Sequence, residues 1–364
     1  MNISFIPAQI AYLVPVLTFL ILAKLLSNRN ILRRRRRRPM LDGSGYGVLI
    51  TGCDSGFGHQ LALRLDRRGF VVFAGCLFPD GTGATNLAQS SSSNLKILKL
   101  DVTSDEQVQH AKMMVQEQLP EKGLWAVVNN AGVTDWAEIE WSTTEDFQSM
   151  LDINLMGCIR TTIAFLPLVR AAKGRMVFMS SILAFFYCLN MSAYSVSKRG
   201  LEAFADCLRV EMASFGVKVR KSLEAHFNHF LPITESGSEL FFQVSIVQPG
   251  NFGPATSIVK PKTAQDIWNK LNEQQKKTFN LQYVEQVVGY VAAMHRSGFK
   301  DANVVVDAML HAVTSEQPKP RYLLVSFIDM FFFKMFPFLP TGLSDAVFSL
   351  SSMYTQRETT LYAE

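Results

Sequence analysis

Tyr194 and Lys198 stand four positions apart in the segment SAYSVSK, residues 192–198. On a helix these two side chains would share one face, with Cβ atoms roughly 5–6 Å apart, so the lysine ammonium could reach the phenol. A free tyrosine titrates near ~10, and a tyrosine base at neutral pH needs roughly 3–4 kcal/mol of local stabilisation. The pair is a candidate proton-exchange device, although this spacing alone also arises often by chance.

Three glycines follow an apolar run in LITGCDSGFGHQLALRL, namely Gly52, Gly56 and Gly58. Glycines at a strand-to-helix turn let backbone N–H groups and a helix N-terminus approach a pyrophosphate without a Cβ in the way. Such turns also occur for purely conformational reasons. The strand-like run before them and the helical pattern after them favour a dinucleotide site.

From residue 45 onward, β-rich apolar runs alternate with helical patterns that would position these residues. After one run, FVVFAGCL, we expect a Ser-rich loop in place of a helix. Alternation with continuous apolar strands predicts an α/β fold, a Rossmann-type doubly wound parallel sheet in a single catalytic domain. We place this domain at residues 44–315. The apolar runs are GYGVLI, FVVFAGCL, LKILKLDV, LWAVVNNAG, GRMVFMSS and VSIVQPG.

Further motifs follow the glycine turn at suitable distances. They are Asp101 in LDVT, the segment NNAG at residues 129–132, Asn154, Ser181, and Tyr194 with Lys198. Together with T-G-x-x-x-G-x-G, this set resembles the short-chain dehydrogenase/reductase family over residues 45–311. The wording TGCDSGFG, FAGC, FLPLVRAAKGR and QPGNF is most similar to the branch that holds 3-hydroxybutyrate dehydrogenase, retinol dehydrogenases and NAD-linked 17β-hydroxysteroid dehydrogenases.

The resemblance implies a role for each catalytic candidate. Tyr194 would exchange a proton with the substrate oxygen, while Lys198 would lower the pKa of Tyr194 and hold the nicotinamide ribose. Ser181 would hydrogen-bond the same substrate oxygen, and Asn154 would anchor a water that relays the proton. Hydride would pass directly between the substrate carbon and the nicotinamide.

The resemblance also implies a set of cofactor contacts. Asp101 would bind the adenine, and residues 129–132 would brace the sheet against the cofactor. Ordinary structural roles stay open for single residues: Ser181 could end a strand, Asn154 could lie in a helical kink, and Asp101 could cap a helix. The implied contacts are Gly52, Ser55, Gly56, Phe57, Gly58, Asp101, Val102, Asn129, Ala131, Gly132, Tyr194, Lys198, Pro249 and Gly250.

The cofactor choice rests on the end of the second strand, where NAD-specific members of the family commonly carry an acidic residue. Gly75 and Cys76 stand there instead. No basic residue at Ser55 or Cys76 would bind a 2′-phosphate, so NAD is favoured over NADP. A threonine that often contacts the carboxamide is expected at Pro254, four positions past the glycine of QPG.

Two segments extend the chain toward a membrane. Residues 5–26 are almost wholly apolar and would span about 33 Å as a helix, close to the ~30 Å core of a bilayer. No basic region precedes them, so we expect a retained anchor at residues 1–28 rather than a cleaved signal. A Phe-rich stretch at residues 321–340 is interrupted by Asp329, Lys334 and Pro337, which makes residues 316–364 a candidate lid or membrane-surface element.

The arginine run at residues 33–38 lies within a basic linker at 29–43. It predicts on which side of the membrane the domain lies. The positive-inside rule holds this run, and the domain after it, on the cytosolic side. We therefore expect the endoplasmic reticulum membrane with a cytosolic catalytic domain. A mitochondrial presequence and a nucleic-acid patch are less favoured, because the arginines flank an apolar span without aromatic interleaving.

Composition excludes several other classes. The net charge of +5 is modest, and the five cysteines form no C-x-x-C pair, which argues against a disulfide framework and a zinc site. His226 and His229 have no acidic or cysteine partner pattern, so no metal site is expected. They lie in residues 220–243, a polar segment that we interpret as an inserted surface loop or extra helix just before the QPG strand. Such an insertion could disturb the cofactor side.

The segment between Ser181 and Tyr194 suggests the substrate. Phe185, Phe186 and Tyr187 would border it and suit a lipophilic alcohol such as a steroid or retinoid, unless they are ordinary core or dimer contacts. The runner-up is a small hydroxy acid such as 3-hydroxybutyrate, which would need a cation facing the pocket. A third hypothesis is a membrane protein that binds a dinucleotide without turnover. Family resemblance also suggests a homo-oligomer.

Overall fold

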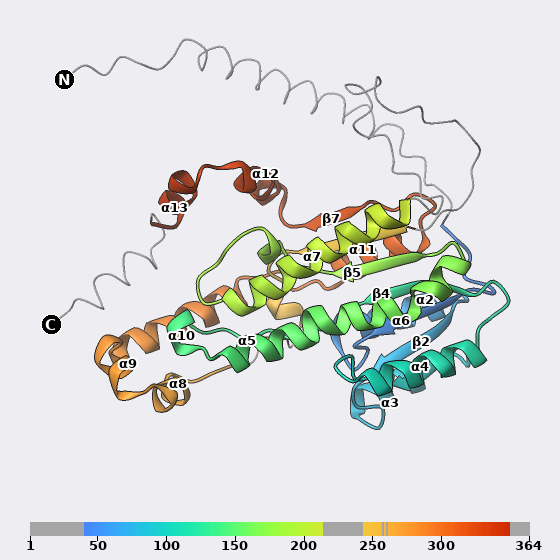
Figure 1. The fold of residues 1–364 in the computed structure, drawn as a ribbon, viewed down its shortest axis with the longest axis horizontal. Coiled ribbons are helices and arrows are strands. Elements are labelled where there is room, and N and C mark those ends of the chain that lie inside the picture. The colour runs from blue at the N-terminus through green and yellow to red at the C-terminus, as the bar shows by residue number, and fades with distance from the viewer. Residues whose placement is uncertain (1–39, 214–242, 257, 260, 350–364) are drawn as a thin grey trace, which may run out of the picture. The chain divides into compact units, whose positions relative to one another are not determined.

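The computed structural model describes residues 40–213, 243–256, 258–259 and 261–349. Its centre is a seven-stranded parallel sheet in the order β3-β2-β1-β4-β5-β6-β7 (Figure 1). The predicted Rossmann-type doubly wound sheet is thus confirmed. The strands are β1 (Gly47–Thr51), β2 (Val71–Cys76), β3 (Leu95–Lys99), β4 (Leu124–Asn129), β5 (Arg175–Met179), β6 (Gln243–Pro249) and β7 (Arg321–Leu324).

The strand order reverses at the middle of the sheet. The chain enters at β1, moves outward to β3, and then returns to pair β4 with the other side of β1. Ligands of open parallel sheets bind in the crevice at the carboxyl ends of such strands. The glycine turn after β1 and the NNAG segment after β4 therefore lie at the edge where a dinucleotide is expected.

Helices cover both faces of the sheet. Apolar side chains of α2, α3 and α11 pack on one face, and those of α4, α6 and α7 pack on the other. Every residue of β1, β4 and β5 is buried, which explains their continuous apolar sequences. The helices are α2 (Gly56–Asp66), α3 (Thr82–Gln89), α4 (Asp105–Glu117), α5 (Thr144–Leu151), α6 (Gly157–Ala171), α7 (Ser192–Ala213), α8 (Ala264–Lys270), α9 (Glu273–Thr278), α10 (Leu281–Arg296), α11 (Asn303–Thr314), α12 (Phe327–Met335) and α13 (Thr341–Ser349), with a π-helix η2 (Asp152–Met156) and 3-10 helices η1 (Ile139–Trp141), η3 (Ile182–Ala184), η4 (Gly253–Ala255) and η5 (Phe336–Phe338).

Two features differ from the expected pattern. The Ser-rich loop after β2 contains a short helix, α3, whose Ala84 and Leu87 are buried against the sheet. In the described part of the chain, the helix that is long and apolar enough to cross a membrane is Thr144–Ala171. This helix covers the sheet through the buried side chains of α6, so packing in the domain explains its apolar composition.

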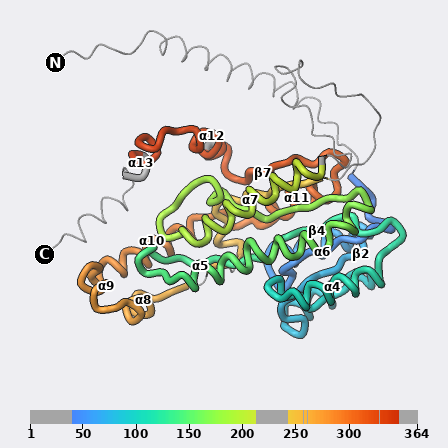
Figure 2. Tube along the Cα trace, viewed as in Figure 1, coloured from blue at the N-terminus to red at the C-terminus, as the bar shows by residue number. Residues whose placement is uncertain are grey.

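A third apolar cluster lies beside the sheet and contains α8 and α10. Figure 2 shows α8, α9 and α10 grouped at one end of the domain, next to α5. Trp136 from the loop after β4 and Met191 from the loop after β5 pack there against Val284 and Val287 of α10. The loops that leave the carboxyl ends of β4, β5 and β6 thus share one apolar core.

The chain beyond residue 315 continues the sheet. β7 pairs in parallel with β6 over Ile246 to Pro249, so the sheet extends past the boundary that we expected at residue 315. β6 is also paired with β5 from its first residue, Gln243. The strand that follows the predicted insertion is therefore paired with a neighbour on each side. The predicted anchor, the arginine run, residues 220–242 and residues 350–364 lie outside the described part.

Candidate active site

A set of hydrogen bonds joins the carboxyl ends of β1 and β4. The Thr51 Oγ1 atom accepts from the backbone N–H groups of Asn130 and Ala131 at 3.0 and 2.9 Å. The Asn130 Nδ2 atom donates to the carbonyl oxygens of Thr51 and Gly52, both at 3.0 Å. Residues 130 and 131 of the segment that we expected to brace the sheet are thus hydrogen-bonded to the end of β1. Thr51 was missed, although a hydroxyl at the end of a strand next to a glycine is the signal for it.

The three glycines of the turn meet different constraints. Gly52 has φ +70° and Gly56 has φ +65°, the left-handed region that favours glycine. A Cβ on Gly58 would lie 2.4 Å from the Gly52 carbonyl oxygen, whereas a Cβ on Gly56 would meet nothing within 4 Å. Ser55 precedes α2 without a side-chain capping bond. The turn therefore combines close packing at Gly58 with open space at the N-terminus of α2, which fits the phosphates of a dinucleotide.

Asp101 and Val102 follow β3. The Asp101 Oδ1 atom accepts from the Thr103 N–H at 2.9 Å and from its hydroxyl at 2.7 Å. Ser104 rather than Asp101 caps α4, so the helix-cap alternative for Asp101 does not apply. The Val102 carbonyl accepts from Arg160 at 2.7 Å. Both residues are held in a tight turn at the edge expected for the adenine.

Asp54 is a further candidate that the sequence reasoning missed. Its Oδ2 and Oδ1 atoms accept from the backbone N–H groups of Leu77 and Phe78 at 3.0 and 2.9 Å, directly after β2. Burial, with the Asp54 charge as a second cause, raises the pKa of Cys76 to about 12. An acidic group therefore does lie at the end of β2, supplied by the glycine turn. The signal was the aspartate inside TGCDSGFG.

Tyr194 and Lys198 lie in the first turns of α7, as predicted. The Lys198 Nζ atom is 5.6 Å from the centroid of the Tyr194 ring and donates to the Met179 carbonyl at 2.8 Å. Burial raises the pKa of Tyr194 to about 12, and a hydrogen bond with Ser181 acts in the opposite direction. Burial also lowers the pKa of Lys198. Ser181 and Tyr194 are thus brought together.

Burial decides the direction of the Tyr194 shift. Desolvation dominates in the chain alone, and the pKa of Tyr194 is raised, while the lowering that we expect from Lys198 stays a prediction. A buried phenol is favoured in its neutral form because burial penalises charge. The lowering that a tyrosine base needs is therefore not a property of the chain alone.

Asn154 lies in η2 and is fully buried. Its Oδ1 atom accepts from the Val133 N–H at 2.8 Å, and its Nδ2 atom donates to the Val133 carbonyl at 2.9 Å and to the Ser197 hydroxyl at 3.0 Å. The side chain therefore ties the loop after β4 to α7. A Cβ on Gly132 would lie 3.1 Å from Asn154 Oδ1 and 3.5 Å from Lys198 Nζ, so Gly132 permits this approach. The water-anchoring role stays a prediction.

The remaining predicted contacts are dispersed around the same edge. The Asn129 Nδ2 atom donates to the Thr162 hydroxyl at 3.2 Å, and its buried Oδ1 atom has no partner among the described residues. Gly250 follows Pro249 at the end of β6 and donates its N–H to the Leu324 carbonyl at 2.9 Å. Phe57 packs edge-on against Phe252 at 6.2 Å between ring centroids.

The aromatic residues expected at the substrate side have different neighbours. Phe186 packs against Phe333 and Phe336 with ring centroids 5.1 and 4.7 Å apart, and the Tyr187 hydroxyl contacts Ser344. They therefore face α12, η5 and α13. These elements lie far later in the chain, so no local pattern could have indicated the contact.

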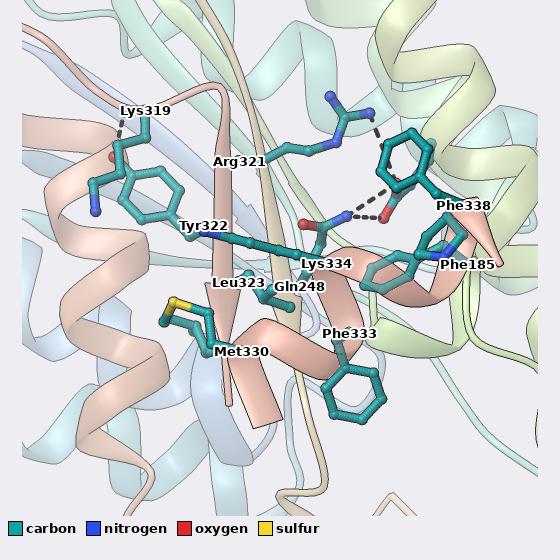
Figure 3. Close-up of a pocket in the computed structure, with 13 residues that line it drawn as sticks. Phe185, Gln248, Lys319, Arg321, Tyr322, Leu323, Met330, Phe333, Lys334 and Phe338 are labelled. Atoms are coloured by element: carbon teal, nitrogen blue, oxygen red, sulfur yellow. Dashed lines mark hydrogen bonds and ion pairs between the residues drawn. The ribbon is translucent and has the colours of Figure 1, made fainter. Parts of the chain in front are cut away.

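Two cavities border this region. One, of about 590 Å³, is lined by residues of β7 and α12 and includes Arg321, Gln248 and Phe333 (Figure 3). The other, of about 500 Å³, is lined by residues of the loops after β4, β5 and β6 and includes Ser192 and Ala193, which immediately precede Tyr194. The lining of neither cavity includes Asn154, Ser181, Tyr194 or Lys198. We take the second cavity as the candidate substrate site because two of its lining residues directly precede Tyr194 in the chain.

Comparisons with known proteins show the family of this chain. A family model described as short chain dehydrogenase matches residues 47–223. The mitochondrial D-beta-hydroxybutyrate dehydrogenase of Rattus norvegicus is 37% identical over 313 residues, covering 84% of each chain. The 17-beta-hydroxysteroid dehydrogenase type 6 of Homo sapiens is 38% identical, and retinol dehydrogenase 7 of Mus musculus 35%, each covering 84% of this chain and 88% of the relative.

The fold agrees as well. A short chain dehydrogenase/reductase from Burkholderia phymatum, solved in complex with NAD, has a TM-score of 0.60 at 18% identity, covering 81% of this chain and 94% of that chain. The fold and the site define a nicotinamide-dependent oxidoreductase that interconverts alcohols and carbonyls. The chain belongs to the short chain dehydrogenase family, in the branch that the motifs indicated.

Replacing Ser181 tests the proton site. In Ser181→Ala, the hydrogen bond that lowers the pKa of Tyr194 is lost, so this pKa rises further and less phenolate forms at any given pH. We expect the rate of alcohol oxidation at neutral pH to fall by about 10²-fold or more, and the pH of half-maximal rate to move upward. The measurement is the pH profile of kcat for oxidation.

Ser181 also accepts from the Leu183 N–H at 3.2 Å, so a structural effect needs a control. Ser181→Thr keeps a hydroxyl and should retain most of the activity and a pH of half-maximal rate close to that of the parent protein. A slower Ser181→Ala enzyme with an unshifted pH profile would contradict the role of Ser181 in setting the pKa of Tyr194.

Proposed function

We propose that this protein is an NAD-dependent dehydrogenase that interconverts a secondary or allylic alcohol and its carbonyl on a neutral, lipophilic substrate such as a steroid or retinoid. The observation that carries the proposal is Tyr194, whose pKa Ser181 lowers, next in the chain to Ser192 and Ala193 on the wall of a cavity of about 500 Å³. A nicotinamide, when bound, supplies the hydride acceptor or donor.

The residues of the chain have separate tasks in this reaction. Tyr194 exchanges the proton with the substrate oxygen, and Ser181 hydrogen-bonds the same oxygen. Lys198 holds the nicotinamide ribose, while Asn154 keeps the loop after β4 and α7 in place and anchors the relay water. Because the Tyr194 phenol is neutral in the chain alone, it is ready to act as the acid in carbonyl reduction. Oxidation requires the phenolate.

The charges of the cavity favour a neutral substrate. Its walls include the apolar side chains of Trp136 and Leu271. Lys262 and Lys270 are cations that the sequence analysis did not find, and they give the hydroxy-acid alternative two candidates. However, the Lys262 Nζ atom is 2.5 Å from Asp135 Oδ1 and donates to the Trp136 carbonyl at 2.8 Å, while Lys270 is exposed to solvent. A substrate carboxylate would therefore compete with Asp135 for the one and with water for the other.

The test is turnover by the full chain with NAD and a panel of steroid alcohols, retinol and 3-hydroxybutyrate. We expect turnover of at least one lipophilic alcohol, and a loss of about 10²–10⁴-fold in Tyr194→Phe, because the proton-exchanging hydroxyl is removed. Tyr46→Phe is the matched control, since Tyr46 packs against Trp125 at the other edge of the sheet. Cofactor binding by folded protein without any turnover would support the silent dinucleotide-binding alternative instead.

The preference for NAD over NADP is assigned to Asp54. Its carboxylate lies at the end of β2, where it would accept from the ribose hydroxyls of NAD and repel the 2′-phosphate of NADP. We expect Asp54→Asn to raise the ratio of kcat/KM with NADP to kcat/KM with NAD by about tenfold or more. Initial rates with both cofactors measure this ratio.

Glu117→Gln is the control for Asp54→Asn. Glu117 ends α4 and is exposed, at the opposite edge of the sheet from the glycine turn. This change removes the same charge without touching the cofactor edge, so the ratio should stay unchanged. An equal change in both variants would mean that net charge, and not Asp54, sets the preference.

We also propose that the protein acts at the endoplasmic reticulum membrane, held by residues 1–28 with the domain in the cytosol, as the sequence predicts. An exposed face of the C-terminal elements supports a second membrane contact. Phe327, Phe331 and Phe338 are 89%, 62% and 80% exposed. Phe327, Phe331 and Met335 recur every four residues along α12, which places them on one side of the helix. Phe333, by contrast, packs inward on the ring of Phe186.

Tryptophan quenching by brominated lipids tests this contact in the full chain in vesicles. In Phe331→Trp, the new indole should enter the bilayer surface and show quenching beyond that of the parent chain. Phe78→Trp is the control, because Phe78 is 65% exposed but lies after β2 at the cofactor edge. Equal quenching of the two added tryptophans would rule out a specific membrane face on α12.

A further inference from the structure

Asn190 lies in the loop between Ser181 and α7, with a backbone held in an unusual conformation. Its φ is +64°, in the left-handed region that asparagine tolerates better than most residues. The Asn190 carbonyl accepts from the Ala137 N–H at 3.0 Å, which joins the loop after β5 to the loop after β4. The position of Asn190 is therefore fixed by its backbone and not by its side chain.

The side chain of Asn190 has unused hydrogen-bonding capacity. The residue is only 7% exposed, and both its Oδ1 and Nδ2 atoms are buried without a partner among the described residues. Buried amides of this kind are nearly always paired, because an unpaired donor or acceptor is costly. Asn190 borders the cavity of about 500 Å³ that adjoins Tyr194. A molecule in this cavity could supply both partners after a side-chain rotation.

The carboxylates of the cavity and the partly buried Lys262 are already paired, and Lys270 is exposed to solvent. Lys262 is bound to Asp135. Asp146 and Asp266 accept from the backbone N–H groups that precede α5 and α8, where each completes a capping box. Asn190 is therefore the buried neutral group on the cavity wall that still has both a donor and an acceptor to offer.

We propose that Asn190 binds a second oxygen function of the substrate, a hydroxyl or a ketone separate from the group that reacts at Tyr194. This inference rests on the proposed function and narrows its substrate class. It favours neutral apolar skeletons with two oxygen functions, such as steroid diols and hydroxy-ketones. Retinol, with a single oxygen, would leave the Asn190 amide unpaired.

The test compares a steroid diol with the two mono-alcohols that each lack one of its hydroxyls. In the parent enzyme we expect kcat/KM for the diol to exceed that for the mono-alcohol that keeps the reacting hydroxyl by about tenfold. Asn190→Gly preserves the left-handed backbone and removes the amide, so this ratio should fall to about one. A parent ratio near one, or an unchanged ratio in Asn190→Gly, would overturn the proposal.

Asn269→Ala is the matched control. Asn269 also borders the cavity, but it is exposed and its Oδ1 atom already accepts from Gln265 at 2.7 Å. The ratio in this variant should equal that of the parent. A similar fall in both variants would mean that any change of the wall alters selectivity, which would overturn the specific role of Asn190.

A binding measurement separates this proposal from the proposed function. Trp136 and Trp141 line the cavity, so a fluorescence titration reports ligand affinity without turnover. If no alcohol is oxidised but Asn190→Gly still weakens diol binding about tenfold relative to mono-alcohol binding, the proposed reaction fails and the binding role of Asn190 holds. If oxidation is observed while the diol and the mono-alcohol bind equally to both proteins, the proposed reaction holds and the binding role of Asn190 fails.

A second variant covers the case in which Asn190→Gly does not fold. Asn190→Asp keeps the side-chain shape and an acceptor but loses the donor. A steroid diol can still donate a hydrogen bond to the carboxylate of that variant, whereas a hydroxy-ketone needs the lost N–H. We therefore expect the affinity for the hydroxy-ketone to fall further than that for the diol, and equal losses would contradict the proposal.

Discussion

The hydrogen bonds of Thr51 to the backbone after β4 are the constraint on which the cofactor edge depends. They hold the carboxyl ends of β1 and β4 at a fixed separation, where the strand order of the sheet reverses. Gly58 has no room for a Cβ because the Gly52 carbonyl lies against it. The helix N-terminus is therefore brought close to the sheet, and the turn residues Asp54 and Ser55 are presented at its edge.

Burial raises the pKa of Tyr194, the candidate proton-exchanging residue, and lowers the pKa of its neighbour Lys198. A shift in the pKa of Tyr194 from 10 to about 12 corresponds to roughly 3 kcal/mol against the phenolate. Lys198 is itself desolvated and directs its ammonium to the Met179 carbonyl. The chain alone thus keeps a neutral phenol in buried surroundings, and a bound cationic nicotinamide would supply a positive charge that favours the phenolate.

The sequence correctly predicted those strands, helices and turns that are encoded by residues close together in the chain. The six apolar runs became strands, and the glycine turn and the Tyr194 helix formed where their spacing indicated. Asp54 was missed because its role depends on Leu77 and Phe78, which only the fold brings to it. The aromatic triplet was assigned to the substrate because α12, which it contacts, lies far along the chain. The cavity of about 500 Å³ could not be predicted from the sequence for the same reason, because its lining residues come from three connections far apart in the chain.

The twelve residues between Ser181 and Tyr194 connect these two candidate residues to two regions beside the sheet. These regions are the α8–α10 cluster and the segment of α12 and η5. Leu183 and Met191 pack into the α8–α10 cluster, while Phe186 packs against α12 and η5. Ser181 is close enough to Tyr194 to lower its pKa. A displacement of α12 would therefore be transmitted to the loop whose two ends hold the reacting groups. The α8–α10 cluster on one side and the phenylalanine-rich α12 and η5 on the other thus pack against one short segment, so both regions constrain the position of the candidate site residues at its ends.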